Sequence, residues 1–367
     1  MASLLSSVRR DKPLVAKNII NKAIESKDET LSVAVGQFYN WGEDNDKGDL
    51  IAIKKLLKHT SLRVKKIAVH ALTSFKEKWH RNVIEVIKTI KVSKNTDLAE
   101  DICQIFHEKN EKYGIPFSAL RDADISAMLS RLVYIPEIGD HHYHIDKFLG
   151  YATERKPYLV TQLFFKRLDV KNKQGKRKGS YHPLPFLGFR FALKGISSKQ
   201  DYPNIILELL RRAASATRWD NFWLPIFFKA ISDGYCEIAL THLRQWVISG
   251  KRRKIEAAAL LLKSAPSNFL FDHKDFVVEI LENAHSISDD CYKNVDGSLF
   301  SCAVSGLREG TPGEPKSHDL NIRERAKEAM TKLQAGSPAH RFYESLVQYG
   351  EREIEDDLAR FEEDFGD

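Results

Sequence analysis

The stretch Asp49–Glu77, DLIAIKKLLKHTSLRVKKIAVHALTSFKE, decides the fold class of this 367-residue chain. Its first half carries apolar residues at helical spacing, namely Leu50, Ile53, Leu56 and Leu57. These residues form one face of a helix, and lysines occupy the opposite face. Thr60 or Ser61 can cap a second helix, which has an apolar face of its own. Neither helix can bury its apolar face alone, so the hairpin must stack on neighbouring hairpins.

The second helix of this hairpin resembles the second helix of a HEAT repeat. HEAT repeats often show the pattern VR..A..AL there, and this chain has Val64-Lys65, then Ala68, then Ala71-Leu72. The proline of the first HEAT helix and the aspartate between the two helices are not evident in this stretch. The resemblance implies a HEAT-like or armadillo-like α-solenoid. An ordinary helical hairpin in a non-repeat α-domain is the alternative.

Flanking segments have a similar layout and extend the repeat prediction along the chain. Leu31, Leu62 and Leu98 take equivalent positions in three second helices, at spacings of 31 and 36 residues. These spacings fall in the range of helical repeats. We therefore expect a region of HEAT-like helical hairpins over residues 1–110.

The rest of the chain is divided by its apolar patterns. Residues 111–200 are less regular, so we expect a joint of helices and loops there, with the aromatic, proline-containing segment 181–191 as the place for any short strand. Helical periodicity returns over residues 201–350. Residues 351–367 form an acidic tail. The expected fold class is all-α, as an α-solenoid of stacked antiparallel helical hairpins (HEAT-like) with an irregular, loop-rich middle.

Polar residues ahead of several apolar stretches predict where helices begin. A side-chain oxygen at such a position can accept a hydrogen bond from the first free amides of a helix. The candidate caps are Asp28, Asp49, Asp97, Asp220, Asp272, Asp289 and Ser337. Gly250 marks the end of a helix, because glycine readily adopts the left-handed conformation that stops one.

The end of the chain carries a second, less specific resemblance. Residues 310–315 (GTPGEP), 323–326 (RERA) and 336–346 (GSPAHRFYESL) look similar to the ends of some large bacterial proteins. That similarity implies a helical-repeat region, in some cases placed behind a signalling NTPase, and a bacterial origin. The phosphate-binding motif of such an NTPase, GxxxxGK[ST], does not occur in this sequence.

The net charge is +7 but is unevenly distributed along the chain. Residues 351–367 contain nine acidic and two basic side chains, which leaves about +14 on the remainder. A basic body favours anionic partners such as nucleic acid, acidic protein segments or phosphate-rich surfaces. The alternative is a soluble basic protein without a polyanion partner. The acidic tail is also a candidate internal competitor for the basic surface.

Cysteine spacing and hydropathy bear on the compartment. The four cysteines lie far apart without a CxxC pair, which fits a reducing cytosol. The chain has no apolar run long enough to span a membrane, and its first residues lack the apolar core of a secretory signal. We therefore expect a cytoplasmic protein with no membrane partner.

Basic side chains gather in two short runs and one pair. Such clusters are typical of phosphate contacts, although a solvated loop has the same composition. The first run lacks interleaved aromatic residues, so single-strand stacking is not indicated. The residues expected to bind nucleic acid or another anion are Lys171, Lys173, Lys176, Arg177, Lys178, Arg211, Arg212, Lys251, Arg252, Arg253 and Lys254.

Three stretches invite a chemical interpretation. Acidic residues over 44–49 suggest a calcium loop, but a lysine stands where its bidentate glutamate would fall. The histidine-rich stretch His141–Asp146 suggests a metal site, with a polar loop as the alternative. Trp219-Asp220 beside Trp223 suggests a base-binding pocket, with helix capping as the alternative. We expect no catalytic residue, no metal ligand and no cofactor.

These observations favour a non-catalytic helical-repeat scaffold or regulatory protein that binds a macromolecular partner along its concave surface. A protein partner is the first expectation, and no small-molecule substrate is indicated. The alternative is a nucleic-acid-binding protein that uses the basic clusters. HEAT-like folds include alkylpurine DNA glycosylases, so an enzymatic version of that alternative remains, although whether the chain is an enzyme stays open.

Overall fold

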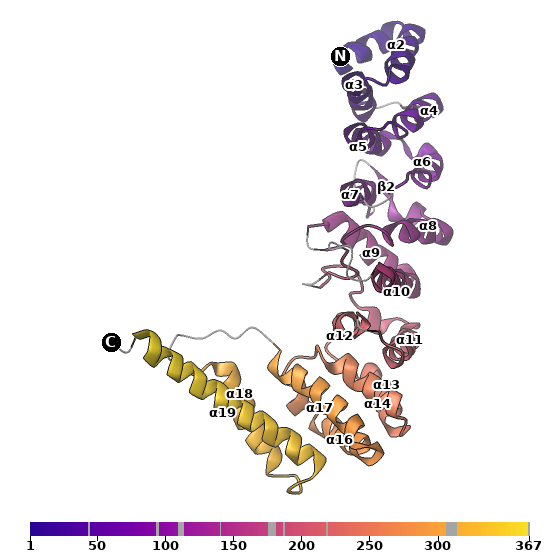
Figure 1. Ribbon diagram of the computed structural model, residues 1–367. Coiled ribbons are helices and arrows are strands. Elements are labelled where there is room, and N and C mark those ends of the chain that lie inside the picture. The colour runs from indigo at the N-terminus through magenta and orange to yellow at the C-terminus, as the bar shows by residue number, and fades with distance from the viewer. Residues whose placement is uncertain are drawn as a thin grey trace. The chain divides into compact units, whose positions relative to one another are not determined.

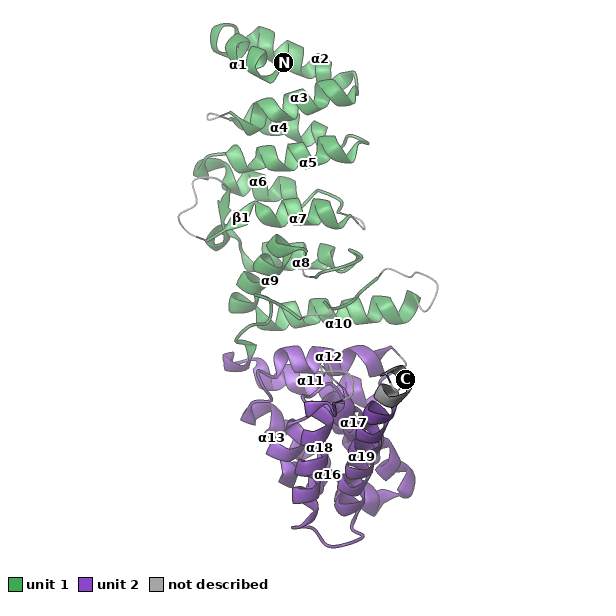
Figure 2. Cartoon of the chain, turned by 90° about the vertical axis from the view of Figure 1, so that its left-hand side faces the viewer, with its two compact units in different colours: residues 1–196 green, residues 197–367 purple. Residues whose placement is uncertain are grey.

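The described part of the chain is mostly helical. Within the described residues there are 19 α-helices and one two-stranded sheet, which confirms the all-α class (Figure 1). None of the described helices is long and apolar enough to cross a membrane. The chain forms two compact units, unit 1 and unit 2, which comprise residues 1–196 and 197–367 (Figure 2). The computed structural model describes residues 1–42, 45–92, 95–108, 114–139, 141–174, 181–185, 188–217, 219–305 and 314–365.

Unit 1 stacks its helices in two columns. One column holds α3, α5, α7 and α9, and each contacts the next member of that column (Figure 1). The other column holds α2, α4, α6, α8 and α10 (Figure 1). The helices are α1 (Ala2–Asp11), α2 (Pro13–Glu25), α3 (Glu29–Asn40), α4 (Lys47–Leu56), α5 (Leu62–Ala71), α6 (His80–Ile87), α7 (Thr96–Gln104), α8 (Asp122–Leu132), α9 (Tyr143–Arg155) and α10 (Pro157–Gln174).

The α4–α5 hairpin shows why the sequence forms these layers. Its apolar positions are buried, including Leu50, Ile53 and Leu56 on α4 and Val64, Ala68 and Ala71 on α5. The Ser61 hydroxyl accepts a hydrogen bond from the Val64 amide and caps α5. A side chain at Gly36 on α3 would collide with Ile67 on α5, so the small residue permits close packing of the two helices.

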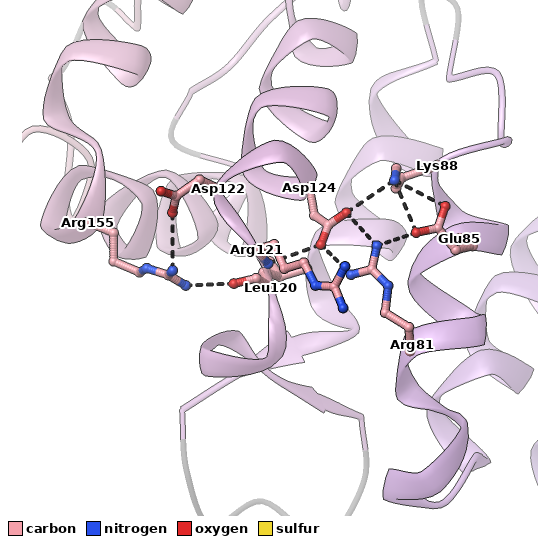
Figure 3. A network of polar contacts seen from close by, with 8 residues as sticks. All are labelled: Arg81, Glu85, Lys88, Leu120, Arg121, Asp122, Asp124 and Arg155. Atoms are coloured by element: carbon pink, nitrogen blue, oxygen red, sulfur yellow. Dashed lines mark hydrogen bonds and ion pairs between the residues drawn. The ribbon is translucent and has the colours of Figure 1, made fainter.

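A polar network joins α6 to α8 (Figure 3). The Asp124 carboxylate, only 1% exposed, pairs with Arg81 at 2.5 Å and with Lys88 at 3.2 Å. It also accepts a hydrogen bond from the Arg121 amide at the start of α8. Glu85 pairs with the same two cations. The hydrogen bonds from Arg81 are the main reason that the pKa of Asp124 lies well below its usual range.

Arg167, on α10, is completely buried and binds backbone rather than a carboxylate. Its guanidinium donates to five carbonyl oxygens at 2.6–3.3 Å, those of Leu132, Val133, Ile135, His182 and Pro183. The ring of Tyr181 lies 4.8 Å from its central carbon. One side chain therefore ties two loops to α10.

The short strands do not lie where the sequence suggested. They are β1 (Phe106–His107) and β2 (Ile115–Pro116), which pair in parallel, whereas the described part of 181–191 is loop. Side chains satisfy that loop's backbone instead of a strand partner. Arg167 takes two of its carbonyls, and the Asp146 carboxylate accepts from the Arg190 and Phe191 amides.

Unit 2 is organised around α14. This helix contacts α11, α12, α13, α16 and α17, and its Ala257–Ala259 run is buried. Gly250, with a φ of +63°, ends the preceding helix as expected. The helices are α11 (Tyr202–Ala214), α12 (Asp220–Ile231), α13 (Glu237–Ile248), α14 (Arg252–Leu262), α15 (Phe269–Asp272), α16 (Lys274–Ile287), α17 (Asp289–Val304), α18 (Ser317–Met330) and α19 (Pro338–Phe365).

Candidate functional site

An open groove of about 400 Å³ crosses four helices of unit 2. Its walls come from the end of α11, the start of α12, the length of α14 with the residue that follows it, and the middle of α17. We call it the unit-2 groove. Its lining residues are Ala213, Ala214, Ala216, Asn221, Arg253, Glu256, Ala257, Leu260, Lys263, Asn294 and Ser298.

One face of α14 supplies the charged side chains of this groove. Arg253, Glu256, Leu260 and Lys263 follow one another at helical spacing, so they lie on the same face. The opposite face of α14 is buried in unit 2, which fixes the orientation of the exposed one. The burial of Ile255, Ala258 and Leu262 therefore turns Arg253 and Lys263 toward the groove.

Glu256 is occupied by contacts within unit 2. Its carboxylate accepts a hydrogen bond from Arg252 Nε at 2.9 Å and another from Asn294 Nδ2 at 2.9 Å. No carboxylate among the described residues pairs with Arg253 or Lys263, and both side chains lie at the surface. The unit-2 groove therefore offers two cations for which the described part of the fold provides no counter-ion.

The floor of the groove consists of small residues, and its remaining walls are polar. Ala213, Ala214 and Ala257 present only methyl groups, so a ligand's backbone can approach closely. The Asn221 and Asn294 amides and the Ser298 hydroxyl line the same space. Carboxamides both donate and accept hydrogen bonds, as a peptide backbone does. The groove therefore suits a polar, anionic and slender ligand.

Among the described residues, the other cations that were expected to bind an anion do not line the unit-2 groove. Arg211 and Arg212 both pair with Glu208 on their own helix, and Lys254 lies 5.1 Å from the Trp246 ring. Lys251 is exposed ahead of α14 and does not line the groove. Lys171 and Lys173 lie at the end of α10 in unit 1. The expected residues Lys176, Arg177 and Lys178 lie outside the described residues.

In the three stretches for which the sequence suggested metal binding or base binding, aspartate side chains make hydrogen bonds within the fold. Asp220 accepts hydrogen bonds from the Thr217 amide and hydroxyl at 2.9 and 2.7 Å, and Trp223 is only 3% exposed. Asp146 accepts hydrogen bonds from backbone amides, and Asp46 caps α4. Within the described part of the chain, no group of three or more histidine, cysteine, aspartate or glutamate side chains is placed to hold a metal ion.

Sequence reasoning found one charged groove residue and missed the others. Arg253 stands out in the sequence because it belongs to a run of four cations. Lys263 lies ten residues further along the chain, and the asparagines come from α12 and α17. The i, i+3, i+7, i+10 spacing from Arg253 could have indicated that Lys263 shares its helix face. The many apolar residues of this helix made that pattern hard to recognise.

Comparison with known proteins adds no family. No protein-family model matches the chain. A search of curated proteins also finds no match. The function must therefore be argued from the geometry of the chain itself.

Proposed function

We propose that this protein is a non-catalytic scaffold of HEAT-like α-solenoid architecture that binds an extended acidic segment of a protein partner in the unit-2 groove. The observation that carries this proposal is the pair of cations, Arg253 and Lys263, on one face of α14 above an alanine floor. Scaffolds of stacked hairpins commonly present binding surfaces along consecutive helices.

The packing of unit 1 supports the solenoid part of the proposal. Each of α3, α5 and α7 contacts the helix two places further along, so the columns grow by adding one hairpin at a time. This pattern is what repeated helical hairpins produce, because each repeat contacts only its neighbours. The residues that cap these three helices, Asp28, Ser61 and Asn95, recur at spacings of 33 and 34 residues. The expected equivalence of Leu62 with Leu31 and Leu98 is wrong, because Leu62 directly follows its cap and is 37% exposed.

The spacing of the two cations indicates the form of the ligand. Ten residues separate them along α14, which corresponds to about 15 Å along a helix axis. An extended polypeptide covers that distance in about four residues, and residues four apart point to the same side of a strand. We therefore expect two acidic side chains at positions i and i+4 of an extended segment, with its backbone against Asn221 and Asn294.

The start of α14 adds to the positive potential. Four consecutive basic residues, 251–254, lie where the helix dipole is also positive, and no side chain caps this helix. Cations at that end destabilise a helix when nothing compensates. An anionic partner near Arg253 would offset this cost, which supports an acidic ligand over a neutral one.

A peptide-binding measurement tests the proposal. The probe is a fluorescent ten-residue peptide rich in threonine and valine, with glutamates at i and i+4, and its control carries glutamines there. We expect saturable binding that Arg253→Glu and Lys263→Glu each weaken about tenfold, or about 1.4 kcal/mol, as loss of a charge-assisted contact predicts. Lys251→Glu is the matched control, because Lys251 is exposed beside α14 but outside the groove.

Two results would contradict this proposal. If the glutamine peptide bound equally well, the cations would not recognise carboxylates. If Lys251→Glu weakened binding as much as Arg253→Glu, the attraction would come from general charge and not from the groove.

Nucleic acid is the second candidate ligand, favoured by the same two cations, Arg253 and Lys263, for which the described residues provide no carboxylate partner. Phosphate contacts release counterions, so affinity for DNA would fall steeply as salt concentration rises. The measurement is binding of a labelled duplex and a labelled single strand across a salt series. Tighter binding of either than of the glutamate peptide, with loss on Arg253→Glu, would replace the peptide by a polyanion as the ligand.

A further inference from the structure

Unit 1 contains a second groove of different chemistry, between α2 and α4. It has a volume of about 400 Å³, and we call it the unit-1 groove. Its floor consists of the buried side chains Ala16, Ile20 and Ala52. Leu14 and Ile51 lie at its edges and are 77% and 54% exposed. The centre of this groove is therefore apolar, in contrast to the polar walls of the unit-2 groove.

Lysines flank this apolar centre from both helices. Lys17 on α2 and Lys55 on α4 line the groove, and both are exposed. Within the described residues, no carboxylate forms an ion pair with either lysine. Lys54 and Lys58 lie on the same helix or just beyond it and add to the positive charge of this part of unit 1.

The polar end of the groove is engaged by the fold itself. Asp49 pairs with Arg9 at 2.6 Å and also accepts a hydrogen bond from the Asp46 amide in the capping box of α4. Burial raises the pKa of Tyr39, so its phenol stays protonated and contributes no charge. Lys17 and Lys55 therefore remain as the groove's available charges.

We propose that the unit-1 groove binds an acidic amphipathic helix of a protein partner. The apolar stripe of that helix would lie on Ile20 and Ala52 between Leu14 and Ile51, and carboxylates on either side of the stripe would pair with Lys17 and Lys55. An apolar stripe flanked by charge is the pattern of an amphipathic helix, and two antiparallel or parallel helices offer a groove for a third. This site is separate from the unit-2 groove.

Designed peptides test this inference on the full chain. One peptide of 16 residues places leucines at i, i+3, i+7 and i+10 with glutamates on both flanks, and a second has the same composition in scrambled order. We expect saturable binding of the first peptide only, with a gain of helical circular dichroism in the complex. Ile51→Asp should weaken binding at least tenfold, and Lys17→Glu and Lys55→Glu should each weaken it about fivefold at low salt.

The controls show whether the peptide binds in this groove. Lys54→Glu carries the same charge change as Lys55→Glu on the same helix, but Lys54 does not line the groove, so binding should be nearly unchanged. Ile51 is exposed, so Ile51→Asp should retain the melting temperature of the unchanged chain. Arg253→Glu should leave binding intact, which distinguishes this site from the unit-2 groove.

Three outcomes would overturn the inference. Equal binding of the scrambled peptide would mean that only its charge is recognised. An unaltered affinity of the Ile51→Asp variant would place the peptide elsewhere. Binding to vesicles of anionic phosphatidylserine, with no binding of either peptide, would assign the lysines and apolar edges to a membrane surface.

Discussion

Arg167 shows how much one side chain can determine in this fold. Removing a charge from water is costly, and a buried arginine usually has a carboxylate partner. Here five carbonyl oxygens solvate the guanidinium instead. Burial lowers the pKa of Arg167 to about 10, so it remains protonated at neutral pH. The charge is kept because it satisfies backbone groups that a loop cannot pair with each other.

Replacing Arg167 with methionine should therefore destabilise unit 1 strongly. Methionine fills much of the space but donates no hydrogen bond, so several buried carbonyls lose their partner. Each such group costs about 1–3 kcal/mol, and we expect a total loss of about 3–5 kcal/mol in the free energy of unfolding. Urea unfolding followed by circular dichroism measures it. Lys166→Met, at the exposed neighbouring position, should change stability by less than about 0.5 kcal/mol; equal effects would refute the assignment.

The network of Figure 3 connects α6 to α8 in unit 1. Asp124 is almost fully buried, and it joins α6 to α8 while also accepting a hydrogen bond at the start of α8. Asp122, in the same first turn, is 53% exposed and pairs with Arg155 and Lys156. The two aspartates therefore share a helix turn but differ in burial.

Asp124→Asn should cost more stability than Asp122→Asn. Asparagine at 124 keeps the shape but leaves Arg81 and Lys88 without their buried carboxylate, for an expected loss of about 2 kcal/mol. Exposed ion pairs are screened by solvent and contribute little to stability, so Asp122→Asn should lose less. Because the folded pKa of Asp124 is lowered, its contribution is present above its unfolded value and declines as pH falls below it. Urea unfolding midpoints of the unchanged chain and of both variants, measured at pH 7 and pH 3.5, provide the test. The prediction would be wrong if Asp124→Asn lowered the midpoint equally at both pH values, or no more than Asp122→Asn does.

Helix existence could be predicted from the sequence more reliably than the residue that begins each helix. Ser337 and Asp28 cap their helices as expected. Asp46 rather than Asp49 caps α4, and Asp220 and Asp272 do not stand at the cap positions of α12 and α16. Asn95 rather than Asp97 caps α7, and Ser288 rather than Asp289 caps α17. In the latter two cases neighbouring residues compete for the same role, and only the backbone conformation decides between them. The same limit applies to any helix with several polar residues before it.

The first helix and the two grooves could not be predicted, because they depend on tertiary contacts. The α1 sequence lacks a regular apolar stripe, but Leu5 is buried and Arg9 pairs with Asp49, forty positions away. The unit-2 groove assembles asparagines and cations from helices far apart in the sequence. Periodicity identifies which face of a helix is apolar, whereas the neighbours of the polar face are set by how the helices stack.

The structure shows where part of the unevenly distributed charge of the chain is paired. Part of the negative charge of α19 is used within unit 2, since Glu351 pairs with Lys327 and Asp357 pairs with Lys316. The helix continues to Phe365, so the described part of the expected acidic tail is helical. We still expect these acidic residues to compete with an anionic ligand for the basic surface. A chain that lacks residues 351–367 should then bind the glutamate peptide more tightly than the full chain.

Residues 1–196 and 197–367 should each fold when expressed alone, because each unit is compact and has its own buried core. We expect each fragment to show helical circular dichroism and a single cooperative thermal transition. The matched control is residues 1–156, which end before α10 and so remove Arg167 and the helix that packs on α8 and α9. That fragment should melt without cooperativity or aggregate, since it exposes apolar surface and leaves loop carbonyls unpaired. A 1–196 fragment that behaved like the 1–156 control would show that unit 1 is not an independent folding unit.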